Sequence, residues 1–172
     1  MNLHGLDDYI KDNASKICIG TFDGFHKGHQ ELAKNSDYLV TFFPHPKSII
    51  SNIENFEVLT FPEELNFLFR NKITIPFEDS IQKMTATRFL DEIIGKLLKP
   101  TQITIGYDFK FGVNQTGDIN LLYKWGRKNN CKIIEIPKKI HPNGIPYKSS
   151  IIRKELKNDV NLAFELLGHE YP

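Results

Sequence analysis

Two histidines with a spacing of three residues lie in a glycine-rich stretch near the start of the chain. Residues 20–29 have the sequence Gly-Thr-Phe-Asp-Gly-Phe-His-Lys-Gly-His, with the histidines at His26 and His29. Glycine lets the backbone turn tightly and approach a ligand closely. Two imidazoles, a lysine and the positive end of a following helix together favour a polyphosphate. A loop with two solvated histidines is the structural alternative, and zinc is disfavoured because no third ligand stands nearby.

A second group of candidate residues follows a run of apolar and β-branched residues. Phe42 and Phe43 end this run and precede Pro44-His45-Pro46. Proline cannot donate to a β-ladder, so we expect an extended and exposed loop here. Aromatic rings beside a rigid proline loop could form a shelf for a flat ring, although each phenylalanine taken alone is also typical of a core position.

A third candidate loop has glycines at both ends and alternating aromatic and charged residues between them. It spans residues 106–112, with the sequence Gly-Tyr-Asp-Phe-Lys-Phe-Gly. If this stretch is extended, Asp108 and Lys110 share one face and the aromatic rings share the other. A turn leading into a hairpin, with a solvated Asp and Lys, is the structural alternative.

The fourth candidate element lies near the end of the chain. Ser149 and Ser150 open a helical segment, and Arg153 follows one turn later. Two hydroxyls and a guanidinium at a helix start suit a phosphate group. Taken alone, the same residues are typical of an ordinary helix cap.

Strand-like runs alternate with helical segments along the chain. We expect strands at residues 16–20, 38–43, 73–77, 102–105 and 132–136. We expect helices at residues 29–35, 62–70, 85–98 and 118–128, and two helical turns followed by a helix within 150–167. Such an order predicts an α/β domain with a mostly parallel sheet, in which ligands bind beyond the carboxyl ends of the strands. The loops after the first, second and fourth strands hold three of the candidate groups.

Helix boundaries are indicated by capping residues. Thr85 or Thr87 is expected to cap the helix at 85–98. Asn158 or Asp159 is expected to start the last helix, and Gly168 to stop it.

Composition narrows the class of protein. The chain has 172 residues, 22 basic and 21 acidic side chains, and two cysteines in apolar runs. We therefore expect a single domain over 1–172, no nucleic-acid or membrane partner, no disulfide framework and reduced core thiols. The N-terminus has no signal-peptide pattern and no run approaches about 20 apolar residues, so we expect a cytoplasmic protein, a monomer or weak oligomer.

Taken together and in this order, the four groups resemble the FMN adenylyltransferase domain of prokaryotic bifunctional riboflavin kinase/FAD synthetases. That family has the motifs Gly-x-Phe-Asp-Gly-x-His-x-Gly-His, Phe-x-Pro-His-Pro, Gly-x-Asp-Phe-x-Phe-Gly, Ile-Ser-Ser-Thr-x-x-Arg and Leu-Leu-Gly-x-x-Tyr. Here the matching stretches are 20–29, 43–46, 106–112 followed by Gly117-Asp118, 147–153, and Leu167-Gly168 to Tyr171. The resemblance covers nearly the whole chain and implies a Rossmann-like nucleotidyltransferase fold with helices on both faces of the sheet.

The resemblance also implies roles for individual residues. Five would be catalytic and hold phosphates: His26, His29, Ser149, Ser150 and Arg153. Seven would bind the nucleotide: Gly20, Thr21, Phe22, Asp23, Gly24, Gly28 and Asp108. Five would lie by the flavin: Phe43, Pro44, His45, Pro46 and Phe111.

The implied reaction is direct transfer of AMP from ATP to FMN, which gives FAD and pyrophosphate. An FMN phosphate oxygen would attack the α-phosphorus of ATP in line, so catalysis would come from positioning and electrostatic stabilisation. Mg²⁺ would arrive with ATP and neutralise the β- and γ-phosphates, with no metal cage built by the protein.

The chain departs from the family pattern in three respects. Tyr147 and Lys148 replace the Ile and first Ser of the fourth motif, and Ser150 replaces its Thr. Few residues separate His29 from Phe42, so we expect a truncated first helix. The family usually carries a riboflavin kinase domain after this one, and we expect the present chain not to phosphorylate riboflavin.

Two other functions fit the same residues. One is a related nucleotidyltransferase with another phosphate acceptor, such as a cytidylyltransferase that acts on a small phosphate ester. The other is a non-catalytic module that binds a flavin or nucleotide, which the altered fourth motif leaves open. Retention of His26, His29 and Arg153 favours the enzyme.

Overall fold

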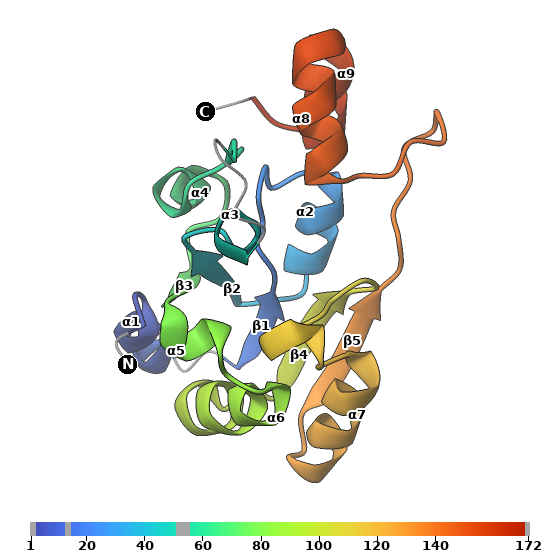
Figure 1. The fold of residues 1–172 in the computed structure, drawn as a ribbon. Coiled ribbons are helices and arrows are strands. Elements are labelled where there is room, and N and C mark those ends of the chain that lie inside the picture. The colour runs from blue at the N-terminus through green and yellow to red at the C-terminus, as the bar shows by residue number, and fades with distance from the viewer. Residues whose placement is uncertain (1–2, 13–14, 51–55, 171–172) are drawn as a thin grey trace.

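A five-stranded parallel sheet forms the centre of the molecule (Figure 1). The computed structural model describes residues 3–12, 15–50 and 56–170. The strands are β1 (Lys16–Ile19), β2 (Tyr38–Phe43), β3 (Lys72–Pro76), β4 (Gln102–Gly106) and β5 (Lys132–Ile136), in the spatial order β3-β2-β1-β4-β5. Each neighbouring pair is parallel, and the strand order reverses between β1 and β4. The expected α/β class with a parallel sheet is confirmed.

Helices cover both faces of this sheet, as expected (Figure 1). They are α1 (Leu6–Lys11), α2 (Lys27–Ala33), α3 (Pro46–Ile50), α4 (Pro62–Leu68), α5 (Asp79–Gln82), α6 (Ala86–Arg88), η1 (Phe89–Leu98), η2 (Val113–Gln115), α7 (Ile119–Lys128), α8 (Ser149–Asn158) and α9 (Val160–Leu167). In the described part of the chain, none of them combines the length and apolar character that a membrane crossing requires.

Side chains alternate between the two faces of each strand, and so build two separate cores. Ile17 and Ile19 of β1 face the larger core, which α1, η1 and α7 cover. Cys18 between them faces a smaller core, which α2 and α4 cover. A third cluster joins α8 to α9, around the fully buried Leu166. The α8–α9 pair lies beyond the carboxyl ends of the strands, at the end of the sheet where α2 begins (Figure 1).

The helix expected at residues 85–98 is present but changes character along its length. Thr85 caps it, because its hydroxyl accepts a hydrogen bond from the Arg88 N–H at 3.3 Å. From Phe89 the helix is of the wider π type, and it closes with a bond from Lys99 N to Ile94 O. The apolar periodicity shows which face is buried but not this widening, since a π-turn shifts the pattern only slightly.

The proline loop differs from expectation. Pro46 begins the short helix α3, and His45 is buried, although Pro44 is exposed as expected. Proline is compatible with the first turn of a helix, where its missing N–H would have no partner. The prediction of a wholly extended and exposed loop was therefore wrong.

The third candidate loop also adopts its alternative form. Residues after β4 make a tight turn closed by Phe109 N to Gly106 O, so the expected two-faced extended stretch is not formed. The rings of Phe109 and Phe111 stack at 5.4 Å instead of lining a common exposed face. Four short helical segments, α1, α3, α5 and η2, were not expected, because each is too short for a clear periodic pattern.

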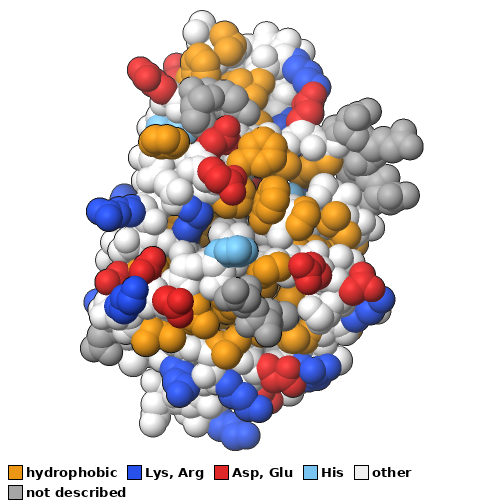
Figure 2. All heavy atoms as spheres, turned by 90° about the vertical axis from the view of Figure 1, so that its left-hand side faces the viewer, with side chains coloured by type: hydrophobic (Ala, Val, Ile, Leu, Met, Phe, Trp, Pro, Cys, Tyr) orange, Lys and Arg blue, Asp and Glu red, His pale blue; other side chains and the backbone are white. Residues whose placement is uncertain are grey.

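The surface carries charges of both signs. On the side of the molecule that bears α1 and α4, acidic and basic side chains are interspersed with hydrophobic ones (Figure 2). The exposed hydrophobic residues of the α3 and α4 region include Ile50 and Phe67, at 64% and 86% exposure.

Candidate active site

The glycine-rich loop leaves the carboxyl end of β1, beside the point where the strand order reverses. It turns back on itself through a hydrogen bond from Phe25 N to Phe22 O at 2.9 Å. Phe22, Gly24 and Phe25 all have positive φ. A Cβ on Gly24 would lie 2.9 Å from the Leu59 side chain, so both the backbone conformation and the space require glycine there. The loop is therefore fixed by its own turn and by the segment around Leu59.

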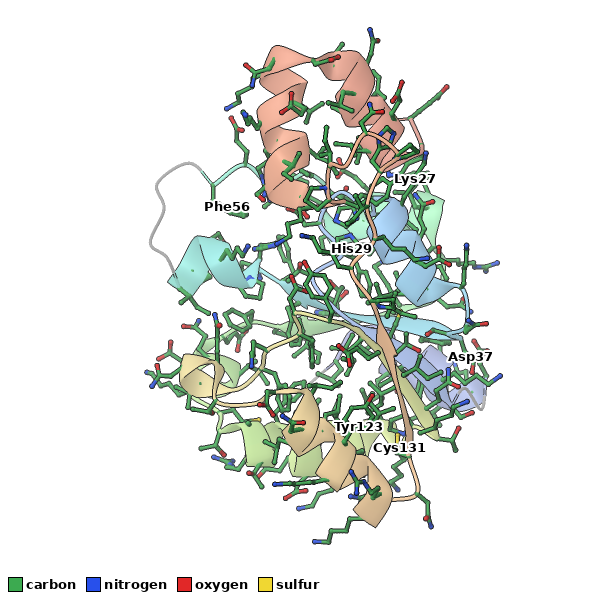
Figure 3. The ribbon with its side chains drawn as sticks, turned by 90° about the vertical axis from the view of Figure 1, so that its right-hand side faces the viewer. Lys27, His29, Asp37, Phe56, Tyr123 and Cys131 are labelled. Carbon is green, nitrogen blue, oxygen red and sulfur yellow. The ribbon has the colours of Figure 1, made fainter. Side chains whose placement is uncertain are left out.

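His26 and His29 lie against each other at the start of α2. His26 caps this helix, because its Nδ1 accepts the His29 N–H at 3.3 Å. The two rings stack with their centroids 3.7 Å apart. His29 lies beneath the α8–α9 pair, between that pair and the sheet (Figure 3). The expectation that the two imidazoles gather at one point is confirmed.

Both histidines are neutral in this environment. Burial lowers the pKa of His26 to about 4. Burial and the proximity of His26 and His45 lower the pKa of His29 well below its usual value. Since Nδ1 of neutral His26 accepts a hydrogen bond, its proton is on Nε2, which is left as a donor. Nδ1 of His29 is buried and has no hydrogen-bond partner among the described residues.

The start of α8 lies beside the same loop. Ser149 Oγ donates to the backbone oxygen of Asp23 at 2.7 Å. A Cβ on Gly28 would lie 3.3 Å from Cβ of Tyr147, so the chain before α8 nearly touches the first turn of α2. Lys148 occupies the cap position of α8, but its side chain makes no capping hydrogen bond. The first N–H groups of a helix have no partner within the helix, so α8 brings donors to this loop.

Asp23 is the most connected side chain of the loop, and its relative exposure is 1%. One carboxylate oxygen accepts the N–H groups of Leu59 at 2.7 Å and Thr60 at 3.3 Å. The other forms an ion pair with Arg153 of α8. Burial raises the pKa of Asp23, whereas Arg153 and the two amides favour its ionised form.

His45, just after the carboxyl end of β2, lies on another side of the site, which we call the His45 wall. Its Nδ1 accepts the Lys47 N–H at 3.1 Å, and its ring lies 4.8 Å from that of Phe56. Burial, with Arg153 and Lys47 nearby, lowers its pKa to about 4, so it is also neutral with its proton on Nε2.

A small hollow opens beside this wall. It is lined by Thr21, Thr41, Phe42, Phe43, His45, Val58, Thr60, Pro62 and Leu65. The Thr41 hydroxyl donates to Thr21 O at 3.1 Å, whereas the buried Thr60 hydroxyl has no partner among the described residues. The hollow thus joins the loop after β1 to the loop after β2.

The third loop, after β4, holds one exposed and one buried candidate residue. Asp108 is exposed, on the side of β4 that faces Leu32 of α2. Phe111 belongs to the larger core, where its ring centroid lies 5.8 Å from that of Phe89. Gly117 permits this packing, because a Cβ there would come within 2.6 Å of the Phe111 ring. The flavin contact of Phe111 remains a prediction.

Several residues of the site have no local signal in the sequence. Phe56 packs between His45 and Arg153, whose guanidinium carbon lies 4.5 Å from the Phe56 ring centroid. Gln30 Nε2 donates to Phe25 O at 3.0 Å and to Leu167 O at 2.9 Å. His169 Nε2 contacts Gly24 O at 3.0 Å. Apart from the bond between Gln30 and Phe25, most of these contacts join segments far apart along the chain, so no spacing rule indicates them.

The closing motif is described only in part. Gly168 ends α9 with a φ of 74°, as expected, and a Cβ there would lie 2.7 Å from the Lys27 side chain. The stem of Lys27 therefore rests on the end of α9 (Figure 3). Tyr171 of the same motif lies outside the described residues.

Metal ligands are not clustered in the part of the chain that the structure describes. Across 3–12, 15–50 and 56–170, there is no group of three or more His, Cys, Asp or Glu side chains placed to hold a metal ion. Within those ranges, His26 and His29 have no third side chain of these types placed to complete a metal site.

Comparison with known proteins gives the same family from several directions. The sequence pattern of the FAD synthetase family matches residues 9–150. The chain is 33% identical to the bifunctional riboflavin kinase/FMN adenylyltransferase of Buchnera aphidicola subsp. Schizaphis graminum, over 98% of this chain and 60% of that protein. It thus spans less than two thirds of that relative's length.

Solved structures share the fold. A crystal structure described as a macrolide-efflux protein from Streptococcus pneumoniae matches with a TM-score of 0.77 at 23% identity, over 92% of this chain and 56% of that one. Pantoate-β-alanine ligase from Francisella tularensis matches with a TM-score of 0.50 at 18% identity, over 96% of this chain and 78% of that one. The motifs, their arrangement in space and the family match agree: the chain belongs to the FAD synthetase family.

Proposed function

We propose that this chain transfers AMP from ATP to FMN, which gives FAD and pyrophosphate. The observation that carries the proposal is the meeting of three elements at one edge of the sheet. The His26–His29 pair stacks at the end of the loop after β1. The start of α8 bonds to that loop through Ser149, and His45 lines a hollow together with Thr21 of the loop. Family membership supports the reaction class, and the arrangement would give the site a phosphate side and an acceptor side that share this loop.

On the phosphate side, the two histidines would act as neutral hydrogen-bond donors. His26 offers Nε2–H, and a bound phosphate would raise the pKa of both rings, because an anion favours the protonated form. The N-terminal N–H groups of α8, with Ser150 beside them, would hold the leaving pyrophosphate. Mg²⁺ would come with ATP and neutralise the β- and γ-phosphates, and Asp108, exposed in the loop after β4, would lie near the nucleotide or the Mg²⁺.

On the acceptor side, Phe43, Pro44, His45 and Pro46 would lie by the flavin. His45 presents an aromatic ring and an Nε2–H donor at the edge of the hollow. A flat ring system can pack on such aromatic residues while its polar edge takes the hydrogen bond.

The proposed chemistry is a single displacement. An oxygen of the FMN phosphate forms a bond to the α-phosphorus of ATP, while the bond from that phosphorus to the bridging oxygen breaks. The electron pair leaves with pyrophosphate, so no covalent enzyme intermediate and no proton transfer is required. His26 and His29 would stabilise the charge that develops on the α-phosphate oxygens.

The proposal is tested by FAD formation from FMN, ATP and Mg²⁺. We expect His29→Ala to lower kcat about a hundredfold or more, because it removes one preorganised donor to the transition state. Conversion of the unsubstituted protein with CTP, or with another phosphate acceptor but not FMN, would favour the related transferase. Binding of FMN and ATP without any turnover would favour the non-catalytic module.

A further inference from the structure

The Asp23 carboxylate links segments that are far apart in the sequence. Its side chain belongs to the loop after β1, yet its partners are the backbone at Leu59 and Thr60 and the guanidinium of Arg153. Ser149 in addition donates to the Asp23 backbone oxygen. The loop after β1, the segment at Leu59 and Thr60 on the acceptor side, and α8 therefore all meet at the buried Asp23.

Arg153 makes its contacts on the acceptor side of the site. Besides the Asp23 carboxylate, its Nε donates to Glu57 O at 2.5 Å and its guanidinium lies over the Phe56 ring at 4.5 Å. Phe56 in turn packs on His45 at 4.8 Å. A planar guanidinium can serve all three partners at once, which an ammonium group cannot do.

The charge of Arg153 is already balanced by Asp23. The side-chain exposures of the pair are 17% for Arg153 and 1% for Asp23, so water screens the pair little. A guanidinium whose charge is balanced by a protein carboxylate attracts a triphosphate only weakly. This arrangement differs from the role that the family resemblance implies for Arg153.

We infer that Asp23 and Arg153 form a positioning pair that fixes the acceptor-side wall. Arg153 supports Phe56 and Glu57 and, through Phe56, the ring of His45. Asp23 holds the amides of Leu59 and Thr60 and keeps Arg153 in place through the ion pair. The inference rests on the proposed function, since it assigns the wall to FMN. It predicts that the pair controls FMN affinity and alignment more than ATP affinity.

Three variants separate shape from charge. Arg153→Lys keeps the cation but loses the planar fork, and Arg153→Met loses both. Asp23→Asn keeps an oxygen that can accept the Leu59 and Thr60 amides but loses the ion pair. We expect each to raise the KM for FMN about tenfold and to leave the KM for ATP within about twofold, the size typical of losing one charge-assisted bond.

A double-mutant cycle tests whether Asp23 acts through Arg153. We expect Asp23→Asn to have no further effect on the FMN constants in the Arg153→Met background, because the interaction is already absent. Arg88→Met is the matched control, since it breaks an exposed arginine–carboxylate pair with Glu92 that is remote from the site. Thermal unfolding of every variant reports whether a change in KM merely follows lost stability.

FMN binding is measured separately, by quenching of FMN fluorescence without ATP, so that the inference does not depend on turnover. Weaker FMN binding by both Arg153→Lys and Asp23→Asn supports it even if no FAD is formed, an outcome that would overturn only the proposed function. Recovery of normal FMN binding and kcat by Arg153→Lys, or a raised KM for ATP alone, would overturn it. Absence of FMN binding by the unsubstituted protein would overturn both.

Discussion

Three neutral histidines define the chemistry of the site at the scale of single residues; His26 and His45 are buried and His29 is partly buried. His26 and His45 each use Nδ1 as an acceptor for a backbone N–H, and so each is left with Nε2–H as a donor. A neutral donor suits the proposed role of the site, which is to bind a phosphate anion and later release it. The proximity of His26 to His29 could be predicted from their spacing. Their low pKa values could not, because burial depends on α8 and α9, more than a hundred residues away along the chain.

The stability of the protein should depend on pH through these histidines. The folded pKa of His26 and His45 is about 4, below the unfolded value of about 6.5. The unfolded state therefore binds more protons between these values, so stability is full above about pH 6.5 and falls as the pH drops toward 4. The loss is about 3 kcal/mol for each histidine.

Denaturant unfolding between pH 4 and 8 measures this loss. His26→Asn is the matched variant, because asparagine can still cap α2 but does not titrate. We expect its stability to fall less steeply than that of the unsubstituted protein between pH 6.5 and 4, and in parallel with it above pH 7. Equal slopes across the whole range would show that His26 is not buried as a neutral ring.

At the scale of elements, most of the fold could be predicted from local patterns. Runs such as Lys16–Ile19 and Lys132–Ile136 are strands as expected, and Asp159 and Gly168 bound the last helix. The misses are short elements and loops. Pro46 is as compatible with a helix start as with an extended loop. His45 favours the helix start, because its Nδ1 accepts the Lys47 N–H and its ring packs against Phe56.

The cap of the long helix offers a test of element stability with an internal control. Thr85 and Thr87 are both exposed, but only the Thr85 hydroxyl caps the helix. We expect Thr85→Ala to lower the free energy of unfolding by about 1 kcal/mol and Thr85→Ser to restore most of it. Thr87→Ala should cause no loss, since alanine favours a helix interior. If thermal unfolding showed a larger loss of stability for Thr87→Ala than for Thr85→Ala, Thr85 would not be the cap.

The site as a whole could be predicted only as a set of motifs, not as an arrangement. Sequence order placed the loops after β1, β2 and β4 at one edge of the sheet, and the structure confirms that edge. The Asp23–Arg153 pair joins residues 130 positions apart, and Phe56 completes it from a third segment. Such contacts depend on how α8 and α9 pack, for which local periodicity carries no information.

At the scale of the whole molecule, α8 and α9 form a unit with its own apolar cluster. This cluster contains Leu59, Ile152, Ala163, Leu166 and Leu167, and it is separate from the two cores on the sheet. Polar contacts from Gln30 and His169 tie it to the loop after β1. Because Ser149 and Arg153 lie on α8, opening of this unit would disassemble the site without unfolding the sheet.

Amide hydrogen exchange should therefore separate the C-terminal helices from the sheet. Leu166 and Leu122 are both fully buried, the first in the α8–α9 cluster and the second in the larger core. Each change to alanine should cost about 2–5 kcal/mol at its own site. We expect Leu166→Ala to speed exchange in α8 and α9 while β1 and β4 keep their protection, and Leu122→Ala to speed exchange throughout. If ATP binds as proposed, it should slow exchange in α8, because the proposed site exists only while α8 and α9 are packed on the loop after β1. Identical exchange patterns for the two variants would mean that the helix pair and the sheet unfold as one cooperative unit.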